Sequence, residues 1–241
     1  MKLAGSSSAF DQLLRSGDLT QLEWIDFCAH ELLADGAVFD VRHFPRTDSD
    51  YLAQVKKMAV DLGLTVAAVR DDAFFAGDER SGALSFEIAV ALGAPLLAAP
   101  LPAQTSVTWA QVQTRLGAAT ALAKRVNVTV AVTNKASTFG ETTHDLRRVT
   151  KEADSAWLRY GPRLDAFDAG SEPELLLPKT VLAWCAAEAS QSTRTKTLEL
   201  LHSYIGFLVL DADGGSASAA QTKDAFAKWR EASRTTIVNR T

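Results

Sequence analysis

The chain repeats a short apolar segment along its whole length, and each copy is followed by an amphipathic helical stretch or a polar turn. This alternation predicts parallel strands joined by crossover helices. The eight candidate strands are residues 3–6, 37–42, 65–71, 95–100, 128–134, 163–168, 180–185 and 206–211. Because a closed (β/α)8 barrel takes roughly 250 residues, eight such units in 241 residues predict a single TIM barrel over residues 1–241.

Local signals place the ends of several predicted helices. Thr20 is followed three residues later by Glu23, the spacing of a capping box. Gly63, Gly93 and Asn127 follow apolar helical stripes and are expected to end helices, since glycine and asparagine adopt the left-handed backbone most readily. The predicted barrel is therefore supported by helix ends as well as by strands.

The sixth crossover is irregular. The predicted sixth and seventh strands start only about 17 residues apart, against roughly 26 to 35 elsewhere, which leaves room for a short helix at most. Either the barrel is thinly covered there or the sixth strand lies elsewhere. An apolar patch at this gap would be a surface for a homodimer.

Composition excludes some classes of function. The formal net charge is −4 and the sequence has no basic stripe, which argues against a nucleic-acid partner. Cys28 and Cys185 have no CxxC spacing, so we expect buried free thiols. Residues 1–8 lack the apolar core of a signal peptide, and the apolar stretch 88–102 is interrupted by Gly93 and prolines. We therefore expect a cytoplasmic protein with no membrane partner.

Four phrases carry a resemblance to a known family: Ala34-Asp35-Gly36-Ala37, Leu62-Gly63-Leu64-Thr65, Ala91-Leu92-Gly93-Ala94-Pro95 and Val128-Thr129-Val130-Ala131. With them the chain resembles the sugar phosphate isomerase and epimerase family, within the xylose isomerase-like barrel superfamily. The resemblance runs over nearly the whole chain. Each phrase marks a helix end that leads into a buried strand, so the resemblance informs the fold more than the chemistry.

The resemblance also implies a divalent metal, held by a Glu ending strand five, an Asp and a His after strand six, a His on strand seven and a Glu on strand eight. The corresponding residues here are Thr133, Asp168, Ser171, Trp184 and Asp211. At most two of these ligands are kept, and hard divalent cations need more donors than that. We therefore expect no metal cofactor, and a site that binds anions because Lys135 adds a positive charge.

Two sets of residues are candidates for binding an anionic ligand. Arg42, Arg70 and Lys135 fall at predicted strand ends, which converge on one mouth, and guanidinium groups bind phosphate or carboxylate through paired hydrogen bonds. The alternative is that they pair with nearby acids. The second set follows Asp211, where Gly214, Gly215 and Ser216 precede a helix whose backbone N–H groups could face a phosphate. A plain turn and helix cap is the alternative there.

The candidates for proton transfer are Asp168 as a base, His43 as an acid or base, and Lys135, which could instead hold Asp168 ionised. A solvated loop histidine is the alternative for His43. The resemblance thus implies an isomerase or epimerase-like enzyme acting on a small phosphorylated or acidic sugar. A barrel without catalysis that binds a ligand or a partner subunit remains the alternative, and a metal-dependent hydrolase or nuclease is a third.

Overall fold

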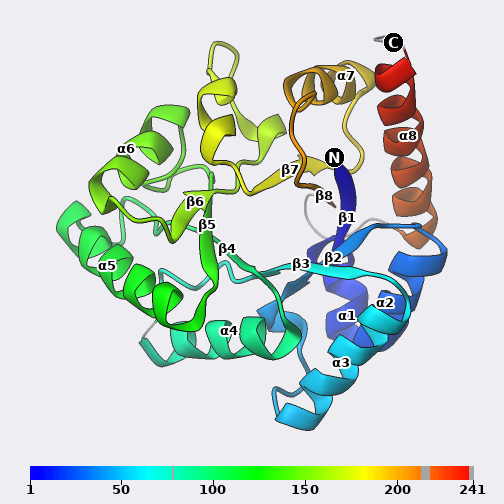
Figure 1. The fold of residues 1–241 in the computed structure, drawn as a ribbon, viewed down its shortest axis with the longest axis horizontal. Helices are drawn as coiled ribbons and strands as arrows, with labels where there is room; N and C mark the ends of the chain where they lie inside the picture. Colours follow the sequence, from blue (N-terminus) through cyan, green and yellow to red (C-terminus); the bar gives the residue numbers. More distant parts are fainter. Residues whose placement is uncertain (78, 213–217, 239–241) are drawn as a thin grey trace.

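The chain folds into one parallel sheet surrounded by helices (Figure 1). The computed structural model describes residues 1–77, 79–212 and 218–238, and for residues 79–81 and 235–238 only the backbone. The eight strands in this part are β1 Lys2–Ser6, β2 Gly36–Asp40, β3 Thr65–Arg70, β4 Leu96–Pro100, β5 Thr129–Thr133, β6 Leu158–Tyr160, β7 Leu182–Ala186 and β8 Phe207–Asp211.

The sheet curls into a nearly closed barrel. Its strand order is β6-β5-β4-β3-β2-β1-β8-β7, and every ladder in it is parallel. Isolated parallel bridges, Tyr160 to Thr180 and Arg163 to Trp184, connect the two ends. The N–H of Trp184 donates to the carbonyl of Pro162 at 2.8 Å. The predicted (β/α)8 barrel is confirmed.

The predicted sixth strand, residues 163–168, was wrong. The strand is Leu158–Tyr160, and half of the predicted segment forms the 3-10 helix η3, Leu164–Ala166. Polar and apolar residues alternate from Arg163 to Ala166, which is the period expected of a strand. The true strand is short because the next two residues are Gly161 and Pro162. Proline has no N–H to donate to the ladder of the sheet.

The expected short sixth crossover is confirmed. Residues 161–181, all of them described, contain η3 and a second 3-10 helix, η4 Pro173–Lys179, but no α-helix. Pro173 and Pro178 lie in η4 and cannot donate helical hydrogen bonds. Both explanations weighed from the sequence hold, since the strand was misplaced and the barrel is also thinly covered there.

The remaining connections carry helices that pack on the outside of the barrel (Figure 1). The α-helices in the described part are α1 Asp11–Ser16, α2 Gln21–His30, α3 Ser49–Asp61, α4 Glu79–Leu92, α5 Trp109–Val126, α6 Thr143–Ala153, α7 Gln191–Leu200 and α8 Ala219–Val238. Two further 3-10 helices, η1 Ser7–Phe10 and η2 Val41–His43, follow β1 and β2 directly.

The predicted helix ends are confirmed. Thr20 and Glu23 form a reciprocal capping box at the start of α2. Gly63 and Gly93 both have φ of +74°, and Asn127, the C-cap of α5, has φ of +59°. These left-handed conformations end each helix and turn the chain into the next strand.

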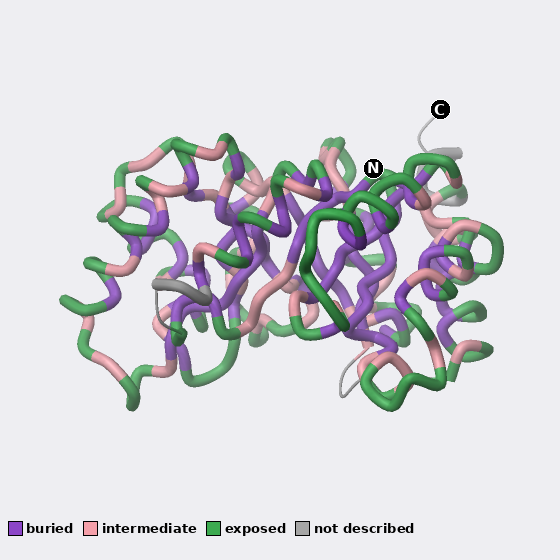
Figure 2. Tube along the Cα trace, turned by 90° about the horizontal axis from the view of Figure 1, so that it is seen from below, coloured by how far each residue is buried: buried purple, intermediate pink, exposed green. Residues whose placement is uncertain are grey.

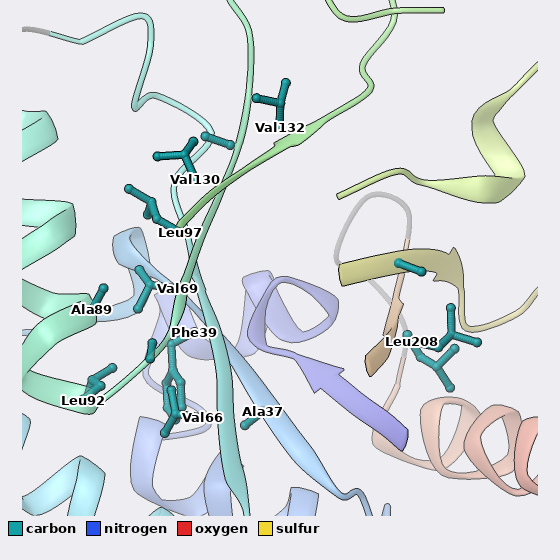
Figure 3. Close-up of a cluster of buried hydrophobic side chains, with 14 of the residues drawn as sticks. Ala37, Phe39, Val66, Val69, Ala89, Leu92, Leu97, Val130, Val132 and Leu208 are labelled. Carbon is teal, nitrogen blue, oxygen red and sulfur yellow. The ribbon is translucent and has the colours of Figure 1, made fainter. Parts of the chain in front are cut away.

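The core has two layers. Between sheet and helices, larger side chains pack together, and Figure 3 shows Val69 and Leu97 from neighbouring strands on the side of the sheet where Ala89 and Leu92 of α4 lie. Inside the barrel the residues are mostly small; this second cluster is Ala4, Val38, Ala67, Ala68, Ala98, Ala131, Leu182, Trp184 and Val209. In Figure 2 the buried residues gather in the interior of the molecule, while the outermost parts of the trace are mostly exposed. The small interior residues leave room for the Trp184 ring.

Two smaller expectations concern thiols and membranes. Cys28 and Cys185 are both free and buried. Burial, with Asp165 adding to it, raises the pKa of the Cys185 thiol to about 12. None of the described helices combines the length and apolar character needed to cross a bilayer.

Candidate functional site

A pocket of about 340 Å³ lies where the carboxyl ends of the strands meet. This end of a (β/α)8 barrel is where ligands bind in enzymes of this architecture. The lining residues are Arg70, Asp72, Pro100, Thr133, Asn134, Lys135, Ala136, Arg163, Asp165, Ala166 and Trp184. We call this the mouth pocket.

Arg70, the last residue of β3, is held by four hydrogen bonds. Its Nε and Nη2 donate to the two carboxylate oxygens of Asp72, at 2.9 and 3.2 Å. Its Nη1 donates to the Ser8 hydroxyl and to Asp211 Oδ2, each at 2.7 Å. With its side chain 20% exposed, Arg70 presents a fixed guanidinium to the mouth pocket.

Asp211, the last residue of β8, bridges two arginines beneath the mouth pocket. Its side chain is 3% exposed, and Oδ2 accepts from Arg70 and, at 3.3 Å, from Arg163 Nη1. Arg163 Nε also lies 3.5 Å from Asp165 Oδ1. Two cationic side chains from distant parts of the chain thus share one buried carboxylate, which offsets much of their charge.

Residues after β5 complete one side of the mouth pocket. The amide of Asn134 accepts from the Arg163 N–H at 2.6 Å and donates to the Arg163 carbonyl at 3.1 Å, so the loop after β5 is tied to the exit of β6. Lys135 Nζ lies 3.4 Å from Asp72 Oδ2, and its side chain is 55% exposed. Of the three cations that line the mouth pocket, Arg70, Arg163 and Lys135, the Lys135 side chain is therefore the one held least firmly by its contacts.

Trp184 on β7 forms an aromatic wall of the mouth pocket. The Arg70 guanidinium lies 5.4 Å from its ring centroid, within the range of a cation–π contact. The indole Nε1 is buried and has no hydrogen-bond partner among the described residues. Trp184 is only 3% exposed and belongs to the cluster inside the barrel, so little of its ring faces the mouth pocket.

The ion pairs fix the charge states in the mouth pocket. Burial by itself would raise the pKa of the Asp72 carboxyl, but Arg70 and Lys135 outweigh it and hold the pKa below its usual 3.8. Burial likewise disfavours a charged Arg70, yet Asp211 and Asp72 raise the pKa of its guanidinium. Both groups remain ionised at neutral pH.

The structure corrects the predicted position of Asp168. Asp168 is exposed and does not line the mouth pocket, because the strand expected to carry it is absent. Ser171 does not line it either. The carboxylate of this segment that lines the pocket is Asp165, and neither Asp165 nor Arg163 was among the residues predicted from the sequence. The phrase Gly161-Pro162, which ends a strand, was the signal that could have found both.

His43 and Arg42 lie away from the mouth pocket and line a separate cavity. The His43 side chain is fully buried; its Nδ1 lies 2.8 Å from the Ser7 hydroxyl and its Nε2 lies 2.9 Å from Asp11 Oδ1. Arg42 Nε pairs with Asp11 and Asp40, at 3.1 and 3.2 Å. Arg42 thus pairs with nearby acids, which was the alternative considered from the sequence. His43 is enclosed between Ser7 and Asp11.

Of the remaining candidates, Arg70 and Lys135 line the mouth pocket as predicted, and Asp211 lies directly below it. Arg70 pairs with Asp72, one of the nearby acids considered as its alternative partner. Gly214, Gly215 and Ser216 lie outside the described residues.

The residues of the mouth pocket do not fit a divalent metal ion. Thr133 ends β5 and Trp184 lies in the middle of β7, and neither supplies a ligand that a hard divalent cation prefers. The carboxylate of Asp211 already accepts from two guanidinium groups. Cationic side chains this close repel a metal ion. Throughout the part of the chain that the structure describes, no group of three or more His, Cys, Asp and Glu side chains is arranged to hold one.

Comparisons with known proteins bear on the fold. No model of a known protein family matches the chain, and no curated protein matches it. Solved structures do. The probable 3-DHS dehydratase AsbF from Bacillus anthracis matches with a TM-score of 0.75 at 12% identity, covering 94% of this chain and 98% of that one.

Two further solved structures agree. D-psicose 3-epimerase from Clostridium cellulolyticum H10 has a TM-score of 0.75 at 13% identity, covering 98% of this chain and 99% of its own. A xylose isomerase domain protein from Alicyclobacillus acidocaldarius has a TM-score of 0.74 at 13% identity, covering 97% and 98%. Identities this low establish the fold alone. The chain therefore has the (β/α)8 barrel fold of these xylose isomerase-like structures.

Proposed function

We propose that the protein binds a small sugar, neutral or carrying one carboxylate, in the mouth pocket and does so without a metal ion. The observation that carries this proposal is the alternation of charged groups around one pocket. Arg70, Lys135 and Arg163 supply donors, and Asp72 and Asp165 supply acceptors between them. A sugar hydroxyl both donates and accepts, so a ring of hydroxyls can use both kinds of group.

The charge balance favours such a ligand over a sugar phosphate. Among the described residues, the lining holds three cationic side chains and two carboxylates, and the Asp211 carboxylate pairs with two of the cations. A phosphate ester with a charge near −2 would bring its oxygens close to Asp72 and Asp165. A single carboxylate, or no charge, matches the pocket better.

A calorimetric titration tests the proposal with D-glucose, D-glucuronate and D-glucose 6-phosphate as probes. We expect glucuronate or glucose to bind more tightly than glucose 6-phosphate, with EDTA having no effect. The variant Arg163→Gln should weaken binding roughly tenfold, since it removes a charged hydrogen-bond donor. Arg159→Gln is the matched control, because Arg159 lies on β6, just before Arg163, but does not line the mouth pocket.

Tightest binding of glucose 6-phosphate would instead support a phosphorylated ligand. Equal losses in the Arg163 and Arg159 variants would remove the mouth pocket as the binding site.

Proton transfer, the activity of an isomerase or epimerase, is a second candidate, and Asp165 favours it. Its Oδ2 accepts from the Ala186 N–H at 3.0 Å, while its buried Oδ1 has no hydrogen bond among the described residues and lies 3.5 Å from Arg163 Nε. In this reaction Oδ1 takes a proton from the carbon beside a carbonyl, and the electron pair moves to the carbonyl oxygen. Arg163 or Lys135 stabilises that oxygen. The hydroxyl on the neighbouring carbon then passes its proton to that oxygen, and Asp165 returns the carbon proton to the former carbonyl carbon, which completes an aldose–ketose isomerisation.

Deuterium incorporation separates the two functions. If the protein only binds sugars, NMR in D2O shows binding but no loss of the proton beside the carbonyl. If it transfers protons, deuterium enters the bound sugar, and Asp165→Asn abolishes the exchange while binding persists.

A further inference from the structure

A second cavity, of about 720 Å³, opens on the outer surface between α6 and η4. Figure 1 shows α6 beside the short helical turns that connect β6 and β7. We call this cavity the α6–η4 groove. It is lined by His144, Arg147, Arg148, Thr150, Lys151, Glu152, Asp154, Tyr160, Leu175, Pro178 and Lys179.

The groove exists because the sixth crossover has no α-helix. Helix α6 packs on α5 on one side and on η4 on the other. A 3-10 helix covers less of its neighbour than an α-helix does, since it is narrower and short. One face of α6 is therefore left open along its length.

The α6–η4 groove carries a surplus of positive charge. Four Lys and Arg side chains line it against two acids, Glu152 and Asp154. Arg148 is paired with Glu152, but no ion pair within the described residues involves Arg147, Lys151 or Lys179, and all three are exposed. The whole chain has a formal charge of −4, so this surplus is a local feature.

The cations form a line rather than a point. His144, Arg147 and Lys151 recur at helical spacing on α6, over about 10 Å of helix axis, and Lys179 belongs to the opposite wall. Convergent donors bind a single phosphate, whereas a line of cations fits an extended chain of carboxylates. Leu175, which is 42% exposed, and Pro178 add an apolar surface on the η4 side of the groove.

We propose that the α6–η4 groove docks an extended acidic segment of a partner protein, with its carboxylates along α6 and an apolar side chain on Leu175. A homodimer through this gap was the expectation from the sequence. A two-fold dimer would place the groove against its own copy, and its positive charges would repel one another. A nucleic-acid duplex needs more phosphate contacts than a surplus of two charges provides.

Fluorescence anisotropy with a labelled peptide rich in glutamate, with leucines between the glutamates, tests the proposal. The triple variant Arg147→Gln, Lys151→Gln, Lys179→Gln should bind the peptide roughly tenfold more weakly, since three exposed ion pairs are lost. The control triple variant Lys56→Gln, Lys124→Gln, Lys196→Gln changes the net charge equally at exposed positions elsewhere and should bind like the wild type. Leu175→Ser should weaken binding of this peptide but not of polyglutamate.

Three results would overturn the proposal. The first is equal weakening in both triple variants, which would mean non-specific charge attraction. The second is tighter binding of a labelled single-stranded oligonucleotide than of the peptide. The third is a dimer in sedimentation that Arg147→Gln disrupts. None of the substituted residues lines the mouth pocket, so sugar binding should be unchanged in every variant.

Discussion

Arg70 and Asp211, which lie 141 residues apart in the chain, are joined at the barrel mouth by a hydrogen bond of 2.7 Å between Nη1 and Oδ2. The bond connects the ends of β3 and β8, which are not neighbours in the sheet. Because Arg163 reaches the same carboxylate oxygen, one buried acid holds two guanidinium groups in place. The mouth is therefore organised by ion pairs across the barrel.

Replacing Asp211 with Asn should destabilise the fold strongly. The variant leaves two largely buried guanidinium groups without their shared counter-charge, which costs about 3 kcal/mol in the free energy of unfolding. Urea denaturation measures the change. Asp224→Asn is the control, since its carboxylate is 64% exposed and pairs with Lys228 on the surface. A loss in Asp211→Asn no larger than in this control would show that the bridge does not stabilise the barrel.

Stability should depend on pH in opposite senses at Asp72 and Asp40. The folded-state pKa of Asp72 is lowered, so its contribution is present above the usual 3.8 and is lost as the pH falls through the lower folded-state pKa. Burial, opposed by Arg42 and Arg70, raises the pKa of Asp40, so its contribution is present at low pH and is lost as the pH rises through that raised value.

Urea denaturation of Asp72→Asn and Asp40→Asn from about pH 7 to pH 3 measures both effects. The wild type's advantage over Asp72→Asn should shrink as the pH falls. Its advantage over Asp40→Asn should grow. Parallel pH profiles for the two variants would contradict the assigned charge states.

Lys135→Gln should change the ligand preference without affecting the fold. The Lys135 side chain is 55% exposed and makes one long ion pair with Asp72, so stability should stay within about 0.5 kcal/mol of the wild type. If Lys135 meets the carboxylate of an acidic sugar, affinity for glucuronate falls while affinity for glucose is kept. Equal affinities of variant and wild type for glucuronate would exclude this contact.

His43→Gln should lower stability and leave ligand binding intact. The His43 ring is fully buried between Ser7 and Asp11, and its loss should cost about 2 kcal/mol. His202→Gln, at an exposed position, serves as the control. A large loss of sugar affinity in His43→Gln protein that remains folded would revive the role in proton transfer first expected of His43.

Two glycines should respond oppositely to alanine. Gly117 lies in the middle of α5 with nothing within 4 Å of an added Cβ, so Gly117→Ala should stabilise the protein by about 0.5 to 1 kcal/mol through helix propensity. Gly63 has φ of +74°, and Gly63→Ala should destabilise by about 1 kcal/mol because alanine is strained there. Thermal unfolding compares the two variants, and equal signs would mean that backbone conformation does not decide the outcome.

Local sequence signals account for the barrel and for much of its mouth. Periodic apolar segments and helix-ending glycines are enough to predict most of the strands and the turns between them, because each depends on local backbone chemistry. Thr133, Lys135, Trp184 and Asp211 are predicted near the mouth simply because they lie on or just after buried strands. Arg70 follows from the same reasoning, since it ends a buried strand.

Which groups meet at the mouth depends on how the barrel closes. The residues directly after Pro162 alternate between polar and apolar, as in a strand, and this pattern predicted Asp168 at the mouth. The residues that lie there are Asp165 and Arg163. His43 was expected to face a ligand, but Ser7 and Asp11 enclose it. Partners such as Arg70 and Asp211 are far apart in the sequence. No local sequence pattern shows which acid pairs with which base, because the pairing depends on how the barrel closes.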